Sequence, residues 1–324
     1  ISDAVTLTVS AEAQAVLSVS PQNWLTEGDS VTLSCEVRDS STGWNFSWYK
    51  AVSYRHGLTQ IRDSAGYLMY NVELLSDSSR GSGGSYTLSS AALNNTGVYM
   101  CRAERGEPAY HTQYSNPQPL WITGLSPPVS LTVIPSRSQH FSYKTLSLIC
   151  EEQSKSTGWR VRRYSLSKSK VSDCSSGWGS VTGSTCNISY LSTNDTGVYW
   201  CESESGGSSN PVNITVHDGS VILESSVHPV TEGDPLTLHC LYRDPKSSDL
   251  TAGFYKDGLL LQNQTTGEMI IPNVSKSDEG LYHCKIPEKG ESPQSWISVR
   301  GTLIIYFLII IMIIMIINSG QTYI

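Results

Sequence analysis

Eight cysteines are the side chains in this 324-residue sequence whose spacing points most clearly to a chemistry. They are Cys35, Cys101, Cys150, Cys174, Cys186, Cys201, Cys240 and Cys284. No two of them form a C-x-x-C pair, so the spacing gives no support to a zinc ribbon or a thioredoxin-like redox site. An even number of cysteines at long separations is typical of disulfides formed in an oxidising compartment. We therefore expect an extracellular, disulfide-bonded protein.

Catalytic motifs are absent from the sequence. It has no Walker loop, no nucleophile elbow, no H-E-x-x-H and no EF-hand run. His239 and His283 each precede a cysteine, but their parity turns them to opposite faces, so we expect no shared metal site. The net charge of −7 and the lack of a Lys/Arg block argue against nucleic acid as a partner. We predict no enzymatic activity, no cofactor and no metal.

An internal repeat occurs three times along the chain. Each repeat begins with a run of alternating apolar residues that ends in a Cys: Val31–Cys35, Leu146–Cys150 and Leu236–Cys240. Each closes with a D-x-G-x-Y-x-C motif, in which Asn95 replaces the first Asp: Asn95–Cys101, Asp195–Cys201 and Asp278–Cys284. Tyr and Cys two positions apart on a strand point to the same face. The Cys can then bridge to a second sheet while the Tyr hydroxyl bonds back to the preceding corner.

This motif is typical of the tyrosine corner of immunoglobulin sandwiches. We therefore predict an all-β chain of tandem immunoglobulin-like β-sandwich domains, with bridges Cys35–Cys101, Cys150–Cys201 and Cys240–Cys284. The third strand should place a large core residue 13 or 14 positions after the first Cys, namely Trp48 in repeat one and Phe254 in repeat three. Repeat two has Arg163 there instead. We expect Trp159 and Val161 to fill that core and Arg163 to reach outward.

Two further cysteines, Cys174 and Cys186, flank a Gly/Ser-rich stretch of repeat two that contains Trp178. Twelve positions apart, they are able to close a hairpin loop. We expect an intramolecular staple that contributes to stability. A bridge between two chains is the alternative.

Sequons of the form N-x-S/T occur only before the apolar tail of the chain. This distribution predicts a glycosylated ectodomain. The predicted glycosylation sites are Asn45, Asn94, Asn187, Asn194, Asn213, Asn263 and Asn273.

An apolar run of fifteen residues, Leu303–Ile317, lies near the C-terminus. Uncharged neighbours extend it to about the twenty residues that a transmembrane helix needs. We predict one transmembrane α-helix over 301–320 and a short tail over 321–324, hence a single-pass type I plasma-membrane protein with an extracellular N-terminus. The tail has no Lys or Arg to mark a cytoplasmic side, so a cleaved GPI-anchor signal is the alternative.

Three complete domains are predicted before this run, over 10–124, 125–217 and 218–300. Residues 1–9 contain AVTLTV, which is similar to PVNITV at the end of repeat two. We interpret residues 1–9 as the last strand of a missing upstream immunoglobulin domain.

A protein partner is expected to bind loops or an exposed sheet face. The first candidate is Trp178, in the loop between Cys174 and Cys186. The second is Trp200, whose parity points it away from the core of its sandwich, where an exposed Trp is a frequent binding hot spot. Packing over Arg160 or Arg162 is the alternative role for Trp200.

Trp121 and Trp296 occupy matching positions in the last strands of repeats one and three, and we expect both to pack structurally. The loops before these last strands, which lie near the C-termini of the repeats, contain no sequon. They provide further candidate contact segments over 102–116, 202–210 and 287–293.

With these motifs, the chain resembles the Fc receptors and Fc-receptor-like proteins of the immunoglobulin superfamily. The similar segments span nearly all of residues 10–300 and include LTEGDSVTLSCEV, STGWNFSWYK, CNISYLSTNDTGVYWCES, VTEGDPLTLHCLYRDP, GFYKDG and SKSDEGLYHCKIPEKGESPQSWISV. The resemblance implies an immune receptor that binds immunoglobulin Fc or a related protein ligand. An adhesion or decoy receptor with another protein ligand is the alternative. Family members signal through tail tyrosine motifs or a charged residue in the span, whereas this span is uncharged and its tail has only Tyr323.

Overall fold

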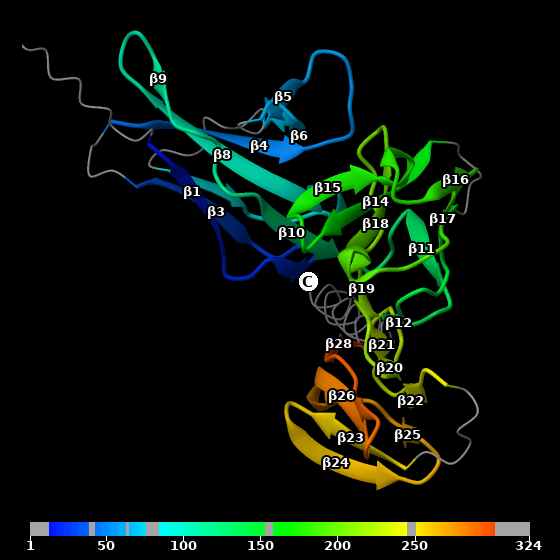
Figure 1. The fold of residues 1–324 in the computed structure, drawn as a ribbon. Coiled ribbons are helices and arrows are strands. Elements are labelled where there is room, and N and C mark those ends of the chain that lie inside the picture. Colours follow the sequence, from blue (N-terminus) through cyan, green and yellow to red (C-terminus); the bar gives the residue numbers. More distant parts are fainter. Residues whose placement is uncertain are drawn as a thin grey trace, which may run out of the picture. The chain divides into compact units, whose positions relative to one another are not determined.

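The computed structural model describes residues 13–38, 43–62, 65–75, 84–152, 158–244 and 251–301 (Figure 1). It divides into two compact units. The first contains Ile1–Leu131, Ile149–Cys186 and Val198–Pro211, and the second contains Thr132–Leu148, Asn187–Gly197 and Val212–Ile324. Within the described ranges, no helix is both long and apolar enough to cross a membrane. The predicted span over 301–320 lies outside these ranges, apart from Gly301.

Repeat one folds as two facing sheets because its strands alternate buried and exposed side chains. The smaller sheet has the order β1 (Ala15–Ser20), β3 (Val31–Val37), β7 (Ser85–Leu88). The larger sheet has the order β2 (Trp24–Thr26), β10 (Gln118–Thr123), β8 (Gly97–Arg105), β4 (Asn45–Ala51), β6 (Leu68–Leu74), β5 (Thr59–Arg62), with β9 (Tyr110–His111) paired to β8. Trp48 is fully buried between the sheets, as predicted, beside Tyr86 and the Cys35–Cys101 bridge.

Repeat two also forms two sheets. One has the order β11 (Val129–Ile134), β13 (Leu146–Glu152), β17 (Thr185–Ile188), β16 (Ser180–Thr182). The other has the order β12 (Gln139–Phe141), β19 (Val212–His217), β18 (Gly197–Ser203), β14 (Trp159–Ser165), β15 (Lys170–Asp173). A short 3-10 turn, η3 (Cys174–Ser176), follows β15 and leads into the loop that carries Trp178.

Repeat three packs around Phe254 and Tyr282, both of which are fully buried. Its first sheet has the order β20 (Val221–Glu224), β22 (Leu236–Tyr242), β25 (Glu268–Ile271). The second has the order β24 (Leu259–Gln264), β23 (Ala252–Lys256), β26 (Gly280–Ile286), β27 (Gly290–Glu291), with β28 (Ser295–Ile297) also paired to β26. A separate parallel pair joins β21 (Val230–Thr231) to β29 (Val299–Arg300), where the repeat ends.

All eight cysteines are joined in four disulfides, and no free cysteine remains. The pairs are Cys35–Cys101, Cys150–Cys201, Cys174–Cys186 and Cys240–Cys284. The structure therefore has the three inter-sheet bridges that the repeats predict. It also has the staple in repeat two within one chain, rather than a bridge between chains.

The tyrosine corners have the hydrogen bonds that the motif predicts. The Tyr99 hydroxyl donates to the Asn95 carbonyl oxygen at 2.6 Å, and the Tyr282 hydroxyl donates to the Asp278 carbonyl oxygen at 2.7 Å. The side chain of Asn95 accepts from the Ala92 amide at 2.8 Å, as the Asp side chains do in the later repeats. Because this role needs only an acceptor oxygen, Asn95 replaces Asp without loss of the corner.

The expectation that Arg163 reaches outward is wrong. Val161 is buried as predicted and Trp159 is half-buried, but Arg163 is buried as well. Its guanidinium lies 4.4 Å from the centre of the Trp178 ring, which covers it. A cation over the face of an indole is stabilised by the ring quadrupole, so the loop that carries Trp178 shields Arg163.

The hydroxyl of Tyr282 provides a test of the tyrosine-corner hydrogen bond in repeat three. Replacing Tyr282 with Phe keeps the ring and removes one hydrogen bond. We expect the free energy of unfolding of repeat three to fall by about 1 kcal/mol at neutral pH. Thermal unfolding monitored by circular dichroism measures this loss. As a control, Tyr190→Phe alters an exposed ring and should leave stability unchanged.

The same variant should change how stability depends on alkaline pH. Burial, and then the charges of Asp278 and Asp257, raise the pKa of Tyr282 to about 12 from its ordinary value of 10.0. A raised tyrosine pKa stabilises the folded state below the ordinary pKa, and this contribution is lost as the pH rises toward 12. Tyr282→Phe should therefore lose less stability than the wild-type chain over this interval, and an equal loss would contradict this assignment.

Candidate binding site

Three large aromatic side chains meet inside the first compact unit. The ring of Trp121, on β10, lies 5.2 Å from that of Trp200 on β18 and 5.8 Å from that of Tyr164 on β14. They belong to one apolar cluster with residues from both repeats: Ala51, Tyr70, Val72, Val98, Met100, Val171 and Val198. Apolar burial of this kind is the main favourable term in such a contact.

The expectation that Trp200 is an exposed contact residue is wrong. The side chain does point away from the core of its own sandwich, but Trp121 and Tyr164 cover it and none of it is exposed. The alternative, packing beside Arg162, agrees with the structure, because the Arg162 guanidinium lies 5.6 Å from the indole centre. The structural role expected for Trp121 is confirmed, since that side chain is buried.

A buried ionic network borders these aromatic rings. Arg162 donates to Asp173 at 2.9 Å and to Glu202 at 2.8 Å, and its side chain is almost fully buried. The indole N–H of Trp200 donates to the other Glu202 oxygen at 3.1 Å, and the Ser53 hydroxyl donates to Asp173 at 3.2 Å. Each buried charge therefore has an opposite charge and further hydrogen bonds, which such groups require.

The network also sets the protonation of its members. Burial alone would raise the pKa of Glu202, but the nearby charges of Arg162 and Lys50 and the hydrogen-bond donors lower it further than burial raises it. Burial lowers the pKa of Lys50, and the charge of Glu202 opposes that effect. Glu202 is therefore held as a carboxylate at neutral pH.

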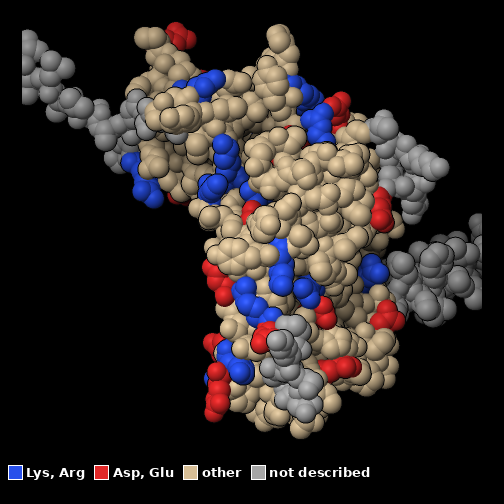
Figure 2. All heavy atoms as spheres, turned by 45° about the vertical axis from the view of Figure 1, so that its right-hand side comes forward, with Lys and Arg blue, Asp and Glu red and all other residues tan. Residues whose placement is uncertain are grey.

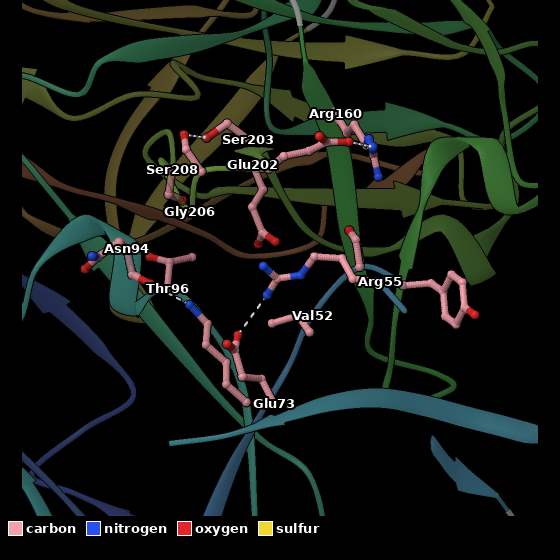
Figure 3. A pocket seen from close by; sticks show the side chains of 15 residues that line it. Val52, Arg55, Glu73, Asn94, Thr96, Arg160, Glu202, Ser203, Gly206 and Ser208 are labelled. Atoms are coloured by element: carbon pink, nitrogen blue, oxygen red, sulfur yellow. Dashed lines mark hydrogen bonds and ion pairs between the residues drawn. The ribbon is translucent and has the colours of Figure 1, made fainter. Parts of the chain in front are cut away.

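A cleft of about 330 Å³ opens beside this network. The side chains of Arg55, Glu73 and Glu202 point into it, and Arg55 pairs with Glu73 at 2.9 Å (Figure 3). Its lining includes three basic residues, Lys50, Arg55 and Arg160, and three acidic ones, Glu73, Glu202 and Glu204. Because these charges balance, the cleft, which we call the Lys50 cleft, has little preference for an ionic ligand.

A second and larger cleft, of about 590 Å³, has Trp178 in its wall, and we call it the Trp178 cleft. Among the described residues that line it, Arg162, Arg163, Lys168 and Lys170 are basic and Asp173 alone is acidic. Asp173 and Glu202 already neutralise Arg162, so the remaining charge of the lining is positive. On the face that Figure 2 displays, basic and acidic residues are scattered in small groups.

Trp178 is held firmly on one side and lines the cleft on the other. Its ring meets that of Tyr199 edge-on at 5.8 Å and stacks over Arg163. It follows η3 by one residue and lies within the Cys174–Cys186 loop. Its indole N–H has no hydrogen-bond partner among the described residues. Trp178 therefore packs on Tyr199 and Arg163 and lines the cleft at the same time.

A different cluster on repeat one has no counterpart in the sequence-based predictions. The guanidinium of Arg105 lies 4.4 Å from the Trp44 ring centre, and Tyr110 lies 6.0 Å from the same ring. Both Arg105 and Tyr110 fall in the predicted contact segment 102–116. The hairpin of β8 and β9 brings them together with Trp44, the residue before β4, a pairing that the sequence spacing does not reveal.

Metal-binding clusters are absent from the described ranges, in which no group of three or more His, Cys, Asp and Glu is suitably placed. His239 lies 3.2 Å from Glu224 and 3.6 Å from Glu268, an exposed ion-pair arrangement. His283 instead stacks on Tyr255, with the ring centres 4.7 Å apart.

Comparison with known proteins agrees with this architecture. The immunoglobulin domain family matches residues 15–104 and 220–297, together more than half of the chain. Human Fc receptor-like protein 2 is 25% identical over 293 residues, which cover 86% of this chain and 52% of that protein. This chain belongs to the immunoglobulin superfamily and is similar to its Fc receptor-like proteins.

Two further relatives align with parts of this chain. The low affinity immunoglobulin gamma Fc region receptor III-A of Cricetulus griseus is 32% identical over 100 residues, which cover 28% of the chain and 34% of that receptor. The solved second Ig-C2 domain of human Fc-receptor like A is 33% identical and covers 25% of the chain and 98% of that domain, with a TM-score of 0.22. The chain spans between 12% and 52% of the lengths of its curated Fc receptor-like relatives.

Two neighbouring arginines on β14 test the ionic network. Arg162→Ala leaves Asp173 and Glu202 without their buried partner, so we expect a loss of about 3 to 5 kcal/mol in the stability of the first unit. Arg160 pairs with Glu204 at the surface. Arg160→Ala should cost no more than about 1 kcal/mol. Urea unfolding monitored by tryptophan fluorescence compares the two, and equal losses would contradict the network.

Proposed function

We propose that this chain is a cell-surface immune receptor, anchored in the plasma membrane by the apolar segment 301–320, that binds immunoglobulin Fc or a related protein ligand. Three observations support the proposal. The relatives are Fc receptor-like proteins, and one of them is named as a receptor for immunoglobulin gamma Fc. The domains are disulfide-bonded immunoglobulin sandwiches. The first unit also has a cleft whose lining suits a protein surface.

The Trp178 cleft is the observation that identifies where such a ligand would bind. Protein interfaces are enriched in Trp, Tyr and Arg, and their energy is concentrated in a few such residues. The cleft supplies Trp178, held by a disulfide loop, and Tyr54, which is 63% exposed. Lys168 and Lys170 add positive charge at its edge. A ligand surface with an apolar centre and acidic neighbours would complement this lining.

Two substitutions test the cleft by different means. Trp178→Ala removes the aromatic wall, and Lys168→Glu reverses an exposed charge without touching the apolar cluster. We expect each to weaken binding to immunoglobulin Fc by about tenfold or more, with Lys168→Glu acting mainly on the association rate. Surface plasmon resonance on the full-length glycosylated chain in lipid nanodiscs gives both quantities.

Lys144→Glu is the matched control, because this exposed lysine is outside the cleft. It should bind as the wild-type chain does. If the wild-type chain shows no saturable binding to Fc, the Fc assignment is wrong and an adhesion or decoy role with another protein ligand takes its place. If Fc binds but neither cleft variant weakens the binding, the Trp178 cleft is not the binding site.

We also propose that the seven sequons are glycosylated in the secretory pathway. None of the seven asparagines lines the Trp178 cleft, whereas Asn94 lines the Lys50 cleft. Glycans would therefore leave the Trp178 cleft accessible. Release with PNGase F in 18O-labelled water, followed by peptide mass spectrometry, should convert these asparagines to 18O-labelled Asp. Unmodified asparagines throughout would contradict an ectodomain assignment.

A further inference from the structure

One face of repeat three exposes large apolar side chains in a row. On the outer side of the sheet β24-β23-β26-β28, Trp296 stands directly opposite Leu281. Beside them, the backbone of Leu281 is hydrogen-bonded to Asp257 in the turn between β23 and β24. Leu260, on β24, pairs with Tyr255, which in turn pairs with His283, two residues after Leu281 on the same face of the sheet. We call Trp296, Leu281 and Leu260 the apolar row.

The side chains of this row are unusually exposed for tryptophan and leucine. Trp296 is 57% exposed, Leu281 37% and Leu260 51%, and the leucines before and after Leu260 on β24 are also exposed. The expectation that Trp296 packs structurally is therefore wrong. Contiguous exposed apolar side chains of this size generally mark a surface that meets another molecule or a membrane.

The position of the row in the repeat indicates what covers it. The corner turn η5 (Lys276–Asp278) immediately precedes β26, and its Lys276 ammonium donates to the Val299 carbonyl oxygen at 3.0 Å. Glu279 accepts from the Val299 amide at 2.8 Å. The start of β26, where Leu281 lies, is therefore at the same end of the sandwich as β29, from which the chain leaves toward its apolar segment.

The connection to that segment is short. Only Gly301 and Thr302 separate Arg300, the last residue of β29, from the apolar run that begins at Leu303. An extended chain advances at most about 3.6 Å per residue, so the run begins within about 11 Å of Arg300. Trp296 lies four residues before Arg300, about 13 Å along an extended strand. Because the connection is so short, tilting of repeat three brings the row to the level of the lipid headgroups.

We propose that the apolar row of repeat three rests on the outer surface of the lipid bilayer, with Trp296 at the headgroup level. The inference rests on the membrane anchorage in the proposed function. Trp is favoured at this depth because its ring is apolar and its N–H is polar. The two leucines of the row contribute apolar area to the same contact. The row thereby limits the orientations of the receptor relative to the membrane.

The charges around the row favour a zwitterionic surface over an anionic one. Lys256 and Lys285 are balanced by Asp257 and Glu291 on neighbouring positions of the same sheet. With no excess of positive charge, the contact depends on apolar insertion and should be insensitive to salt. Asn263, three residues beyond Leu260 on β24, is farther from the end where the chain leaves, so a glycan there does not block the row.

Quenching by brominated lipid tests the contact directly. The full-length chain is placed in phosphatidylcholine nanodiscs whose acyl chains carry bromine, and tryptophan fluorescence is compared with that in unbrominated discs. The chain has eight tryptophans, so Trp296→Phe removes roughly one-eighth of the emission. It should nevertheless abolish most of the bromine-dependent quenching. Trp24→Phe, which alters a partly exposed tryptophan of repeat one, should leave the quenching unchanged.

A second variant tests whether the quenching of Trp296 depends on contact of the whole row with lipid. Leu260→Ser with Leu281→Ser keeps Trp296 and should reduce its quenching by at least half. If the wild-type chain and Trp296→Phe lose the same fraction of fluorescence, the proposal is wrong. It is also wrong if the row mediates pairing of two chains, shown by a dimer that the double serine variant dissociates. Extraction by alkaline carbonate reports separately on anchorage: a chain that is extracted refutes the membrane assignment itself.

Discussion

The packing of Trp121 against Trp200 and Tyr164 is the contact on which the candidate site depends. It buries the outer faces of β10, β14 and β18 within the first unit, and it excludes water from the Arg162 network beside it. In such surroundings an ion pair is stable only when each charge is fully partnered, which Asp173 and Glu202 achieve for Arg162. With these groups fixed, the side chains that line the Trp178 cleft have a defined geometry.

Local sequence patterns were sufficient to predict the sandwiches. Alternating apolar residues, cysteines of the right parity and the D-x-G-x-Y-x-C motif each depend on neighbours within one strand or corner, so the pairing of the cysteines and the Tyr99 and Tyr282 hydrogen bonds followed directly. The environment of Trp200 did not follow. Parity shows that a side chain leaves the core of its own sandwich, but it does not show what covers that side chain. Arg163 was misplaced for the same reason, because Trp178 covers it.

Equivalent positions in the repeats have acquired different roles. Trp121 and Trp296 both lie on the outer face of a last strand, yet Trp121 is buried by aromatic rings of β14 and β18, whereas Trp296 is exposed beside Leu281. The same outer-face position therefore occurs in both repeats, but only in repeat one is its tryptophan buried in an internal contact. On repeat three, the same position is therefore available for an external contact. Fold similarity alone would have assigned both tryptophans one role.

Hydrogen exchange on the Trp121→Ala variant of the full chain tests most directly whether the aromatic contact holds the cleft together. The Tyr70 hydroxyl bonds to the Ser169 carbonyl oxygen and the Lys170 ammonium to that of Leu68, so β6 and β15 depend on the same contact. The account predicts faster amide exchange in both strands together, with β1 and β3 unchanged, because local opening follows the cooperative unit. Faster exchange confined to β10 and its immediate strand neighbours, with β15 unaffected, would contradict it.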